Sequence, residues 1–186
     1  MNKILLRAAV LLLLTLLAGC AAGTVGNAGG SPGAEAGGSP GGAEAAIGLA
    51  VGQTAPDFTL TLNGGGEVTL SQLRGQPVFL NLFTTWCPPC REEIPALQKI
   101  YEEYGDRVSI IGVSVTESAD VVAEFIAASG VGYPVALDPD GIVAADYDVQ
   151  FIPQSWVLDS DGVIADYIPG GTDEAGILAA LAGVLP

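Results

Sequence analysis

Apolar and polar positions after about residue 50 alternate between two patterns that are typical of an α/β domain. Residues 58–62 alternate apolar and polar side chains, and residues 68–70 resume after a glycine-rich turn, which predicts a β-hairpin. Residues 77–83 and 108–115 are nearly continuous apolar runs. Such runs are typical of strands that are covered on both faces of a sheet.

Helical spacing accounts for most of the remaining segments. Apolar positions three and four residues apart predict helices over residues 87–104 and 118–129, the second ending at Gly130. Ser71 and Thr172 are expected to cap two further helices. The other expected elements are short helices at 71–73 and 142–147, a closing helix at 172–185, and strands at 135–137, 155–158 and 163–168.

The order of these elements is a hairpin, then β-α-β-α, then β-β-α. Strands that alternate with helices predict a parallel central sheet, and the late hairpin adds antiparallel strands. We therefore expect an α/β fold with a mixed central sheet, helices on both faces and an N-terminal β-hairpin extension. One domain of ordinary size would occupy residues 51–186.

The first 20 residues are typical of a secretory signal. An apolar run at residues 8–17 follows two basic residues and ends in small residues before Cys20, and it is short for a transmembrane helix. Residues 17–20, LAGC, resemble the bacterial lipobox, in which the signal is cut before a cysteine that then carries lipid. The alternative is an ordinary signal anchor with an incidental cysteine. We expect a signal peptide over residues 1–19 and lipidation of Cys20, which places the domain outside the cytoplasm on a bacterial membrane.

Residues 20–50 are expected to form a flexible linker. They are rich in Gly, Ala, Ser and Pro, contain the near-repeats AGGSPGAEA and AGGSPGGAEA, and show no apolar periodicity. Such a segment tethers a domain without folding itself.

The charge excludes some classes of partner. The chain has 21 acidic and 6 basic side chains and a net charge of −15. This balance argues against nucleic acid and against electrostatic binding to anionic lipid.

The candidate chemistry lies in residues 86–90, WCPPC, at the start of the long helix. With Cys20 assigned to lipid, Cys87 and Cys90 are a single pair that can close a small disulfide ring, and another thiolate can open that ring. A purely structural disulfide is the alternative, although so small a loop stabilises little. The chain has no histidine, its one methionine is Met1, and no second CxxC exists, so we expect no metal and no cofactor.

The spacing also suggests a division of roles. Cys87 would be the nucleophile, because free amides and the helix dipole stabilise a thiolate at a helix N-terminus. Cys90, one turn inside, would be the resolving thiol. Glu93 lies in line with the apolar stripe, where a half-buried carboxylate has a raised pKa and can exchange protons at neutral pH. The alternative for Glu93 is a charge at the edge of the stripe that points outward. Glu117 can reach the site or simply be a solvated loop residue.

This arrangement resembles the thioredoxin fold. Residues 51–58, 70–75 and 83–93 are similar to those of the membrane-tethered extracytoplasmic thioredoxin-like proteins of the TlpA, ResA and CcmG type, in the AhpC/TSA-like redoxin family. Residues 151–155 resemble their proline loop. The resemblance implies a cis Pro153 beside the dithiol, an Ile152 backbone that receives a substrate peptide, a Trp86 that covers the dithiol, and an active-site role for Glu93. It also matches Asn81 to a strand position where cytosolic thioredoxins carry a buried acid.

The resemblance implies an enzyme that reduces protein disulfides, including those of apocytochrome c before haem attachment. A thiol protein in the membrane would re-reduce it, and the domain would be monomeric. Two alternatives stay open. The T-x-x-C spacing at residues 84–87 also occurs in thiol peroxidases, and a thioredoxin fold can serve as a non-catalytic binding lipoprotein.

Overall fold

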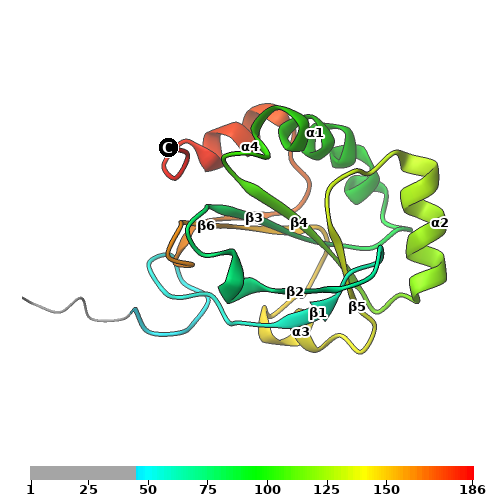
Figure 1. Ribbon diagram of the computed structural model, residues 1–186, viewed down its shortest axis with the longest axis horizontal. Coiled ribbons are helices and arrows are strands. Elements are labelled where there is room, and N and C mark those ends of the chain that lie inside the picture. The colour runs from blue at the N-terminus through cyan, green and yellow to red at the C-terminus, as the bar shows by residue number, and fades with distance from the viewer. Residues whose placement is uncertain (1–44) are drawn as a thin grey trace, which may run out of the picture. The chain divides into compact units, whose positions relative to one another are not determined.

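A five-stranded mixed sheet forms the centre of the protein (Figure 1). A computed structural model describes residues 45–186, so the expected signal peptide, Cys20 and most of the linker lie outside the described residues. The strand order is β5-β4-β3-β6-β7, with β3, β4 and β5 parallel and β6 and β7 antiparallel to their neighbours. The bounds are Val78–Phe83 for β3, Ser109–Val115 for β4, Val135–Asp138 for β5, Gln154–Leu158 for β6 and Ile164–Pro169 for β7.

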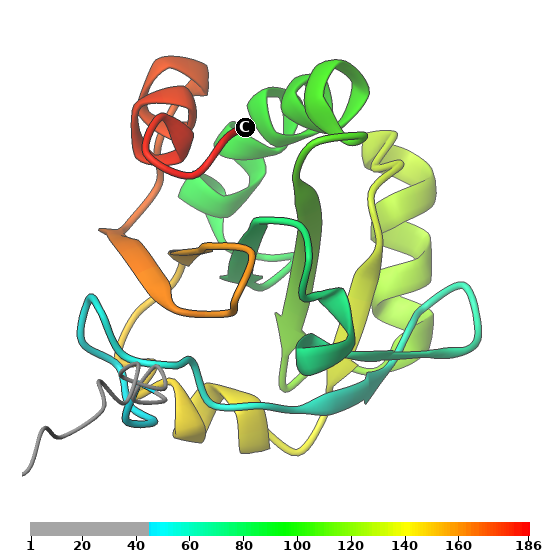
Figure 2. The ribbon, with the colours of Figure 1, turned by 60° about the vertical axis from the view of Figure 1, so that its left-hand side comes forward.

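Helices and a hairpin cover the two faces of this sheet (Figure 2). Helices α1, α2 and α4 contribute to the apolar cluster on one face, and α3 with the hairpin contributes to the cluster on the other. The helices are α1 Pro88–Tyr104, α2 Ala119–Ser129, α3 Ile142–Asp146 and α4 Glu174–Leu181, and the hairpin strands are β1 Thr59–Thr61 and β2 Glu67–Thr69. The predicted fold class is confirmed. Within residues 45–186, no helix is long and apolar enough to cross a membrane.

The position of strand β3 explains why residues 78–83 are almost all apolar. Phe79 and Phe83 enter the cluster beneath α1, whereas Leu80 and Leu82 enter the cluster beneath α3 and the hairpin. Successive side chains of a strand point to opposite faces, so a strand covered on both faces needs apolar residues throughout. Asn81 shares the face of Phe79 and Phe83, and this directs its amide towards α1.

The predictions that Ser71 and Thr172 cap helices are wrong, although both helices are present. Ser71 lies inside a short 3₁₀ helix over Leu70–Leu73, and both its amide and its hydroxyl donate to Asp57, at 2.8 and 2.6 Å. Helix α4 is capped by Asp173, whose carboxylate accepts from the Gly176 amide at 2.9 Å. By contrast, Gly130 ends α2 in the left-handed conformation, with a φ of 73°, as its position predicted.

Residues 45–50, just before the expected domain boundary, form hydrogen bonds and apolar contacts with the domain. The Thr54 amide donates to the Ala46 carbonyl and the Gly48 amide to the Thr54 carbonyl, both at 3.0 Å. Leu49 packs against the core cluster that contains Leu80. Residues 45–50, assigned to the linker from composition, therefore pack on the domain.

Candidate active site

The two thiols lie where β3 passes into α1. Cys87 is the N-cap residue of α1, with an extended backbone, and Pro88 and Pro89 form the first turn, where a missing amide proton costs little. Cys90 follows one turn inside the helix. Both side chains are buried, with 3% and 1% of their surface exposed, and no disulfide joins them in this structure.

The proline loop lies against Cys87. The Ile152–Pro153 bond is cis, and the Cys87 thiol donates to the Ile152 carbonyl oxygen at 3.7 Å. Strand β6 runs antiparallel to β3 and pairs Gln154 with Leu82, so the loop before β6 meets the segment after β3 at the same edge of the sheet. The structure thus brings together Cys87, Cys90, Ile152 and Pro153.

Trp86 is 69% exposed, so most of its indole lies in water beside the dithiol segment. Phe151, which sequence reasoning did not single out, is 50% exposed in the proline loop beside Cys87. The sequence offered one signal for Phe151: it is a large aromatic residue in a loop, directly before Ile152 and Pro153.

Glu93 is more deeply buried than its position on the stripe suggested, with only 3% of its surface exposed. Asn81 donates through Nδ2 to Glu93 Oε1 at 2.6 Å and to Ser155 Oγ at 3.0 Å. The Thr172 amide donates to Glu93 Oε2 at 3.2 Å. The loop packs closely on α1 here, since a Cβ on Gly171 would lie 3.3 Å from the Pro89 carbonyl oxygen.

The environment raises the pKa of both Glu93 and Cys90. Burial raises the pKa of Glu93 from 4.5 to about 7, although the hydrogen bonds from Asn81 and Thr172 oppose the change. The pKa of Cys90 lies well above its ordinary value, first because of burial and then because of its hydrogen bond to Cys87. The charges of Cys87 and Glu93 add to the same effect. Cys90 therefore holds its proton at neutral pH and needs a base to become a nucleophile, and Glu93 is three residues away on the same helix.

Glu117, left open by the sequence, is held by the segment before the thiols. Its carboxylate accepts from the Thr85 amide at 2.9 Å and the Thr85 hydroxyl at 2.6 Å. It is therefore bonded to the active-site loop and is not simply a solvated loop residue.

The acidic and thiol side chains near the site are not arranged to hold a metal. Across residues 45–186, no three His, Cys, Asp or Glu side chains are grouped as a metal ion would require.

Comparison with known proteins agrees with this geometry. The model of the AhpC/TSA family matches residues 51–167, which include the dithiol, Glu93 and the proline loop. The chain belongs to the AhpC/TSA family. It is 38% identical over 123 residues to the thioredoxin-like protein YneN of Bacillus subtilis, a match that covers 64% of this chain and 72% of YneN. It is 35% identical over 128 residues to the thiol-disulfide oxidoreductase ResA of the same organism, covering 68% and 72% of the two chains.

A solved structure with the same fold is also similar to this chain. A putative thiol:disulfide interchange protein DsbE from Chlorobium tepidum superposes with a TM-score of 0.70 at 27% identity, covering 75% of this chain and all of that chain. The chain is a thiol–disulfide oxidoreductase of this family. This activity favours disulfide exchange over the peroxidase and the non-catalytic interpretations of the sequence.

Proposed function

We propose that this enzyme reduces disulfides of extracytoplasmic proteins, with Cys87 as nucleophile, Cys90 as resolving thiol and Glu93 as proton acceptor. The observation that carries the proposal is the seating of Cys87. It is the N-cap residue of α1 and donates to the Ile152 carbonyl oxygen beside cis Pro153, and the buried Cys90 and Glu93 follow it on the same helix.

In the first step the Cys87 thiolate attacks one sulfur of the substrate disulfide. A mixed disulfide forms, and the other substrate sulfur leaves as a thiolate. The positive end of the α1 dipole stabilises negative charge at the Cys87 position. The exposed Trp86 and Phe151 flank this position and offer apolar surface to the substrate polypeptide.

In the second step Cys90 must lose its proton before it can attack Cys87. Glu93, with a pKa of about 7, is partly ionised at neutral pH and accepts that proton. Cys90 then attacks the Cys87 sulfur, and the second substrate sulfur leaves with the bonding electrons. Two electrons have passed to the substrate, and the enzyme holds a Cys87–Cys90 disulfide that an external dithiol must reduce.

The proton on Glu93 has a route to water. Glu93 lines a surface groove of about 860 Å³ together with Pro89, Glu92 and Thr172. The groove lies where the first turns of α1 meet the loop before α4, so the carboxylate returns its proton to solvent on this side while the thiols stay buried.

Location and substrate complete the proposal. The signal pattern at residues 1–19 and the lipobox cysteine Cys20 support a lipid-anchored protein whose linker, up to about residue 44, holds the catalytic domain, residues 45–186, above the membrane. The resemblance to the TlpA, ResA and CcmG type supports reduction of apocytochrome c thiols before haem attachment, with a membrane thiol protein as electron donor.

One experiment tests activity and location together. Membranes from cells that produce the full chain should reduce a disulfide-bonded CxxC peptide when a dithiol donor is supplied, measured by the release of peptide thiols. The Cys20→Ala variant should show the same activity but should incorporate no fatty-acyl label when the cells are fed radiolabelled palmitate, and Cys87→Ala should show no activity. Activity that persists in Cys87→Ala would overturn the assignment of the nucleophile, and acyl label that persists in Cys20→Ala or is absent from the wild type would overturn the lipid anchor.

A further inference from the structure

Both carboxylate oxygens of Glu117 accept hydrogen bonds. The donors are Thr85, in the segment before the dithiol, and Ser114 of strand β4. Oε1 accepts from the Thr85 hydroxyl at 2.6 Å, and Oε2 accepts from the Thr85 amide at 2.9 Å and from the Ser114 hydroxyl at 2.7 Å. Thr85 is only 7% exposed, so these bonds are largely shielded from water. Charge-assisted hydrogen bonds of this kind are stronger than neutral ones.

The opposite side of Thr85 is held as well. Its carbonyl oxygen accepts from Arg91 Nη1 at 3.3 Å, and the Arg91 guanidinium lies 5.4 Å from the centre of the Phe125 ring. Glu117 follows β4, Arg91 belongs to α1 and Phe125 belongs to α2. The peptide groups on both sides of Thr85 are thus held by Glu117 and by Arg91, and Arg91 in turn packs on Phe125 of α2.

The chain turns sharply to bring Glu117 to this place. Thr116 adopts a φ of 56°, a left-handed conformation that is unfavourable for a β-branched residue. Its amide donates to the Asp138 carbonyl at 2.8 Å, which holds the turn. Non-glycine residues keep such conformations when the surrounding structure requires them, often beside functional sites.

We propose that Glu117 is a positioning residue for Cys87, acting through Thr85; this inference rests on the proposed role of Cys87 as nucleophile. Thr85 is two residues before Cys87, and the Cys87 amide donates to the Thr84 carbonyl at 3.4 Å. A fixed Thr85 therefore fixes where the Cys87 sulfur lies relative to Cys90 and to the Ile152 carbonyl. A looser segment loses more conformational entropy when the ring closes, so its disulfide is less stable.

The test is a redox titration of the full chain against glutathione, which reports the stability of the Cys87–Cys90 disulfide. Glu117→Gln cannot accept all three bonds, and we expect its disulfide to be about tenfold easier to reduce, which corresponds to a potential about 30 mV less negative. Thr85→Val keeps the carboxylate charge and the amide but loses the hydroxyl bond. It should shift the potential in the same direction by a smaller amount, whereas Thr85→Ser should restore the wild-type value.

A second carboxylate provides the matched control. Asp57 accepts from the Ser71 amide at 2.8 Å and the Ser71 hydroxyl at 2.6 Å, nearly the same pattern, on the face of the sheet away from α1. Asp57→Asn should leave the potential unchanged even where it lowers the stability of the fold. A shift in Asp57→Asn as large as that in Glu117→Gln would show a general effect of stability and overturn the inference.

The two variants at the Glu117–Thr85 contact also distinguish positioning from an effect of charge. A shift in Glu117→Gln with none in Thr85→Val would assign the effect to charge and contradict a positioning role. Unchanged potentials in both variants, with a wild-type protein that reduces the CxxC peptide, would contradict this inference and leave the proposed function intact. A wild-type protein that neither exchanges with glutathione nor reduces the peptide would overturn both.

Discussion

At the scale of single residues, the buried carboxylate of Glu93 links the chemistry to the stability of the fold. A carboxylate that is 3% exposed is unfavourable when ionised, even with hydrogen bonds from Asn81 and Thr172. The same burial brings its pKa to about 7, where it can take a proton from Cys90 and return it. The proposed proton acceptor is thus a residue whose burial lowers the stability of the fold at neutral pH.

The raised pKa of Glu93 predicts how stability changes with pH. Below pH 4.5 both the folded and the unfolded chain keep Glu93 protonated, so its full contribution is present. Between pH 4.5 and 7 the unfolded chain releases the proton first, and the free energy of unfolding falls by about 3 kcal/mol. Above pH 7 this loss is complete.

Urea unfolding of the reduced protein at pH 4.5 and pH 8 measures this change. Glu93→Gln should lack this component of the pH dependence, whereas Glu92→Gln, at the exposed neighbouring position, should retain it. Equal pH dependence in wild type and Glu93→Gln would show that Glu93 is not the buried titrating group.

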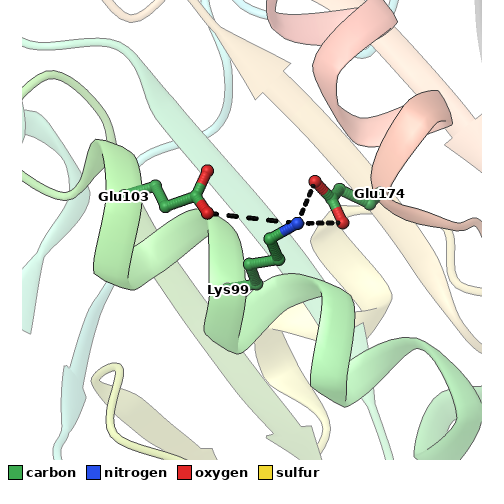
Figure 3. Close-up of polar contacts among 3 residues, drawn as sticks. All are labelled: Lys99, Glu103 and Glu174. Atoms are coloured by element: carbon green, nitrogen blue, oxygen red, sulfur yellow. Dashed lines mark hydrogen bonds and ion pairs between the residues drawn. The ribbon is translucent and has the colours of Figure 1, made fainter.

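At the scale of elements, helix α4 is attached to α1 by two different kinds of contact. Lys99 of α1 lies 2.7 Å from Glu174 and 3.9 Å from Glu103, an exposed cluster shown in Figure 3. Ile177 and Leu181 are fully buried in the cluster beneath α1. Exposed ion pairs stabilise little, whereas buried aliphatic side chains stabilise a great deal.

We therefore expect Ile177→Ala to lower the free energy of unfolding by about 2–5 kcal/mol, because it leaves a cavity in the core. Lys99→Ala should leave the denaturation midpoint unchanged. Chemical denaturation of the two variants side by side measures the contrast. A Lys99→Ala variant as unstable as Ile177→Ala would mean that the ion pair holds α4 in place.

The elements that could be predicted well from the sequence are those whose signal is local. The apolar run of β3 and the Gly130 stop of α2 could be read from neighbouring residues, and the dithiol at the start of α1 from its motif. The caps at Ser71 and Thr172 could not. The partner of Ser71 is Asp57, 14 residues away. At α4 the cap is Asp173, the residue after Thr172, and both residue types are good caps, so residue type alone does not choose between them.

At the scale of the whole molecule, the topology gathers the site at one edge of the sheet. The segments after the parallel strands β3 and β4 carry Cys87 and Glu117, and the loop before the antiparallel β6 carries Pro153. Ligands commonly bind at the carboxyl ends of the parallel strands in open α/β sheets. Cys87 and Pro153, which are 66 positions apart in the chain, meet because of this strand order. Only the resemblance to a known fold made that proximity predictable from sequence.

The proposed division of roles between the two thiols, with Cys87 attacking the substrate and Cys90 releasing it, can be tested in cells. Mixed disulfides are captured in cells that produce the full chain with Cys90→Ala, and mass spectrometry then identifies the cross-linked peptides. We expect thiol-reducible adducts joined at Cys87, and no such adducts from the Cys87→Ala variant. Adducts joined through Cys90 in the Cys87→Ala variant at the same level, or no adducts from Cys90→Ala while the wild type reduces the peptide, would contradict these roles.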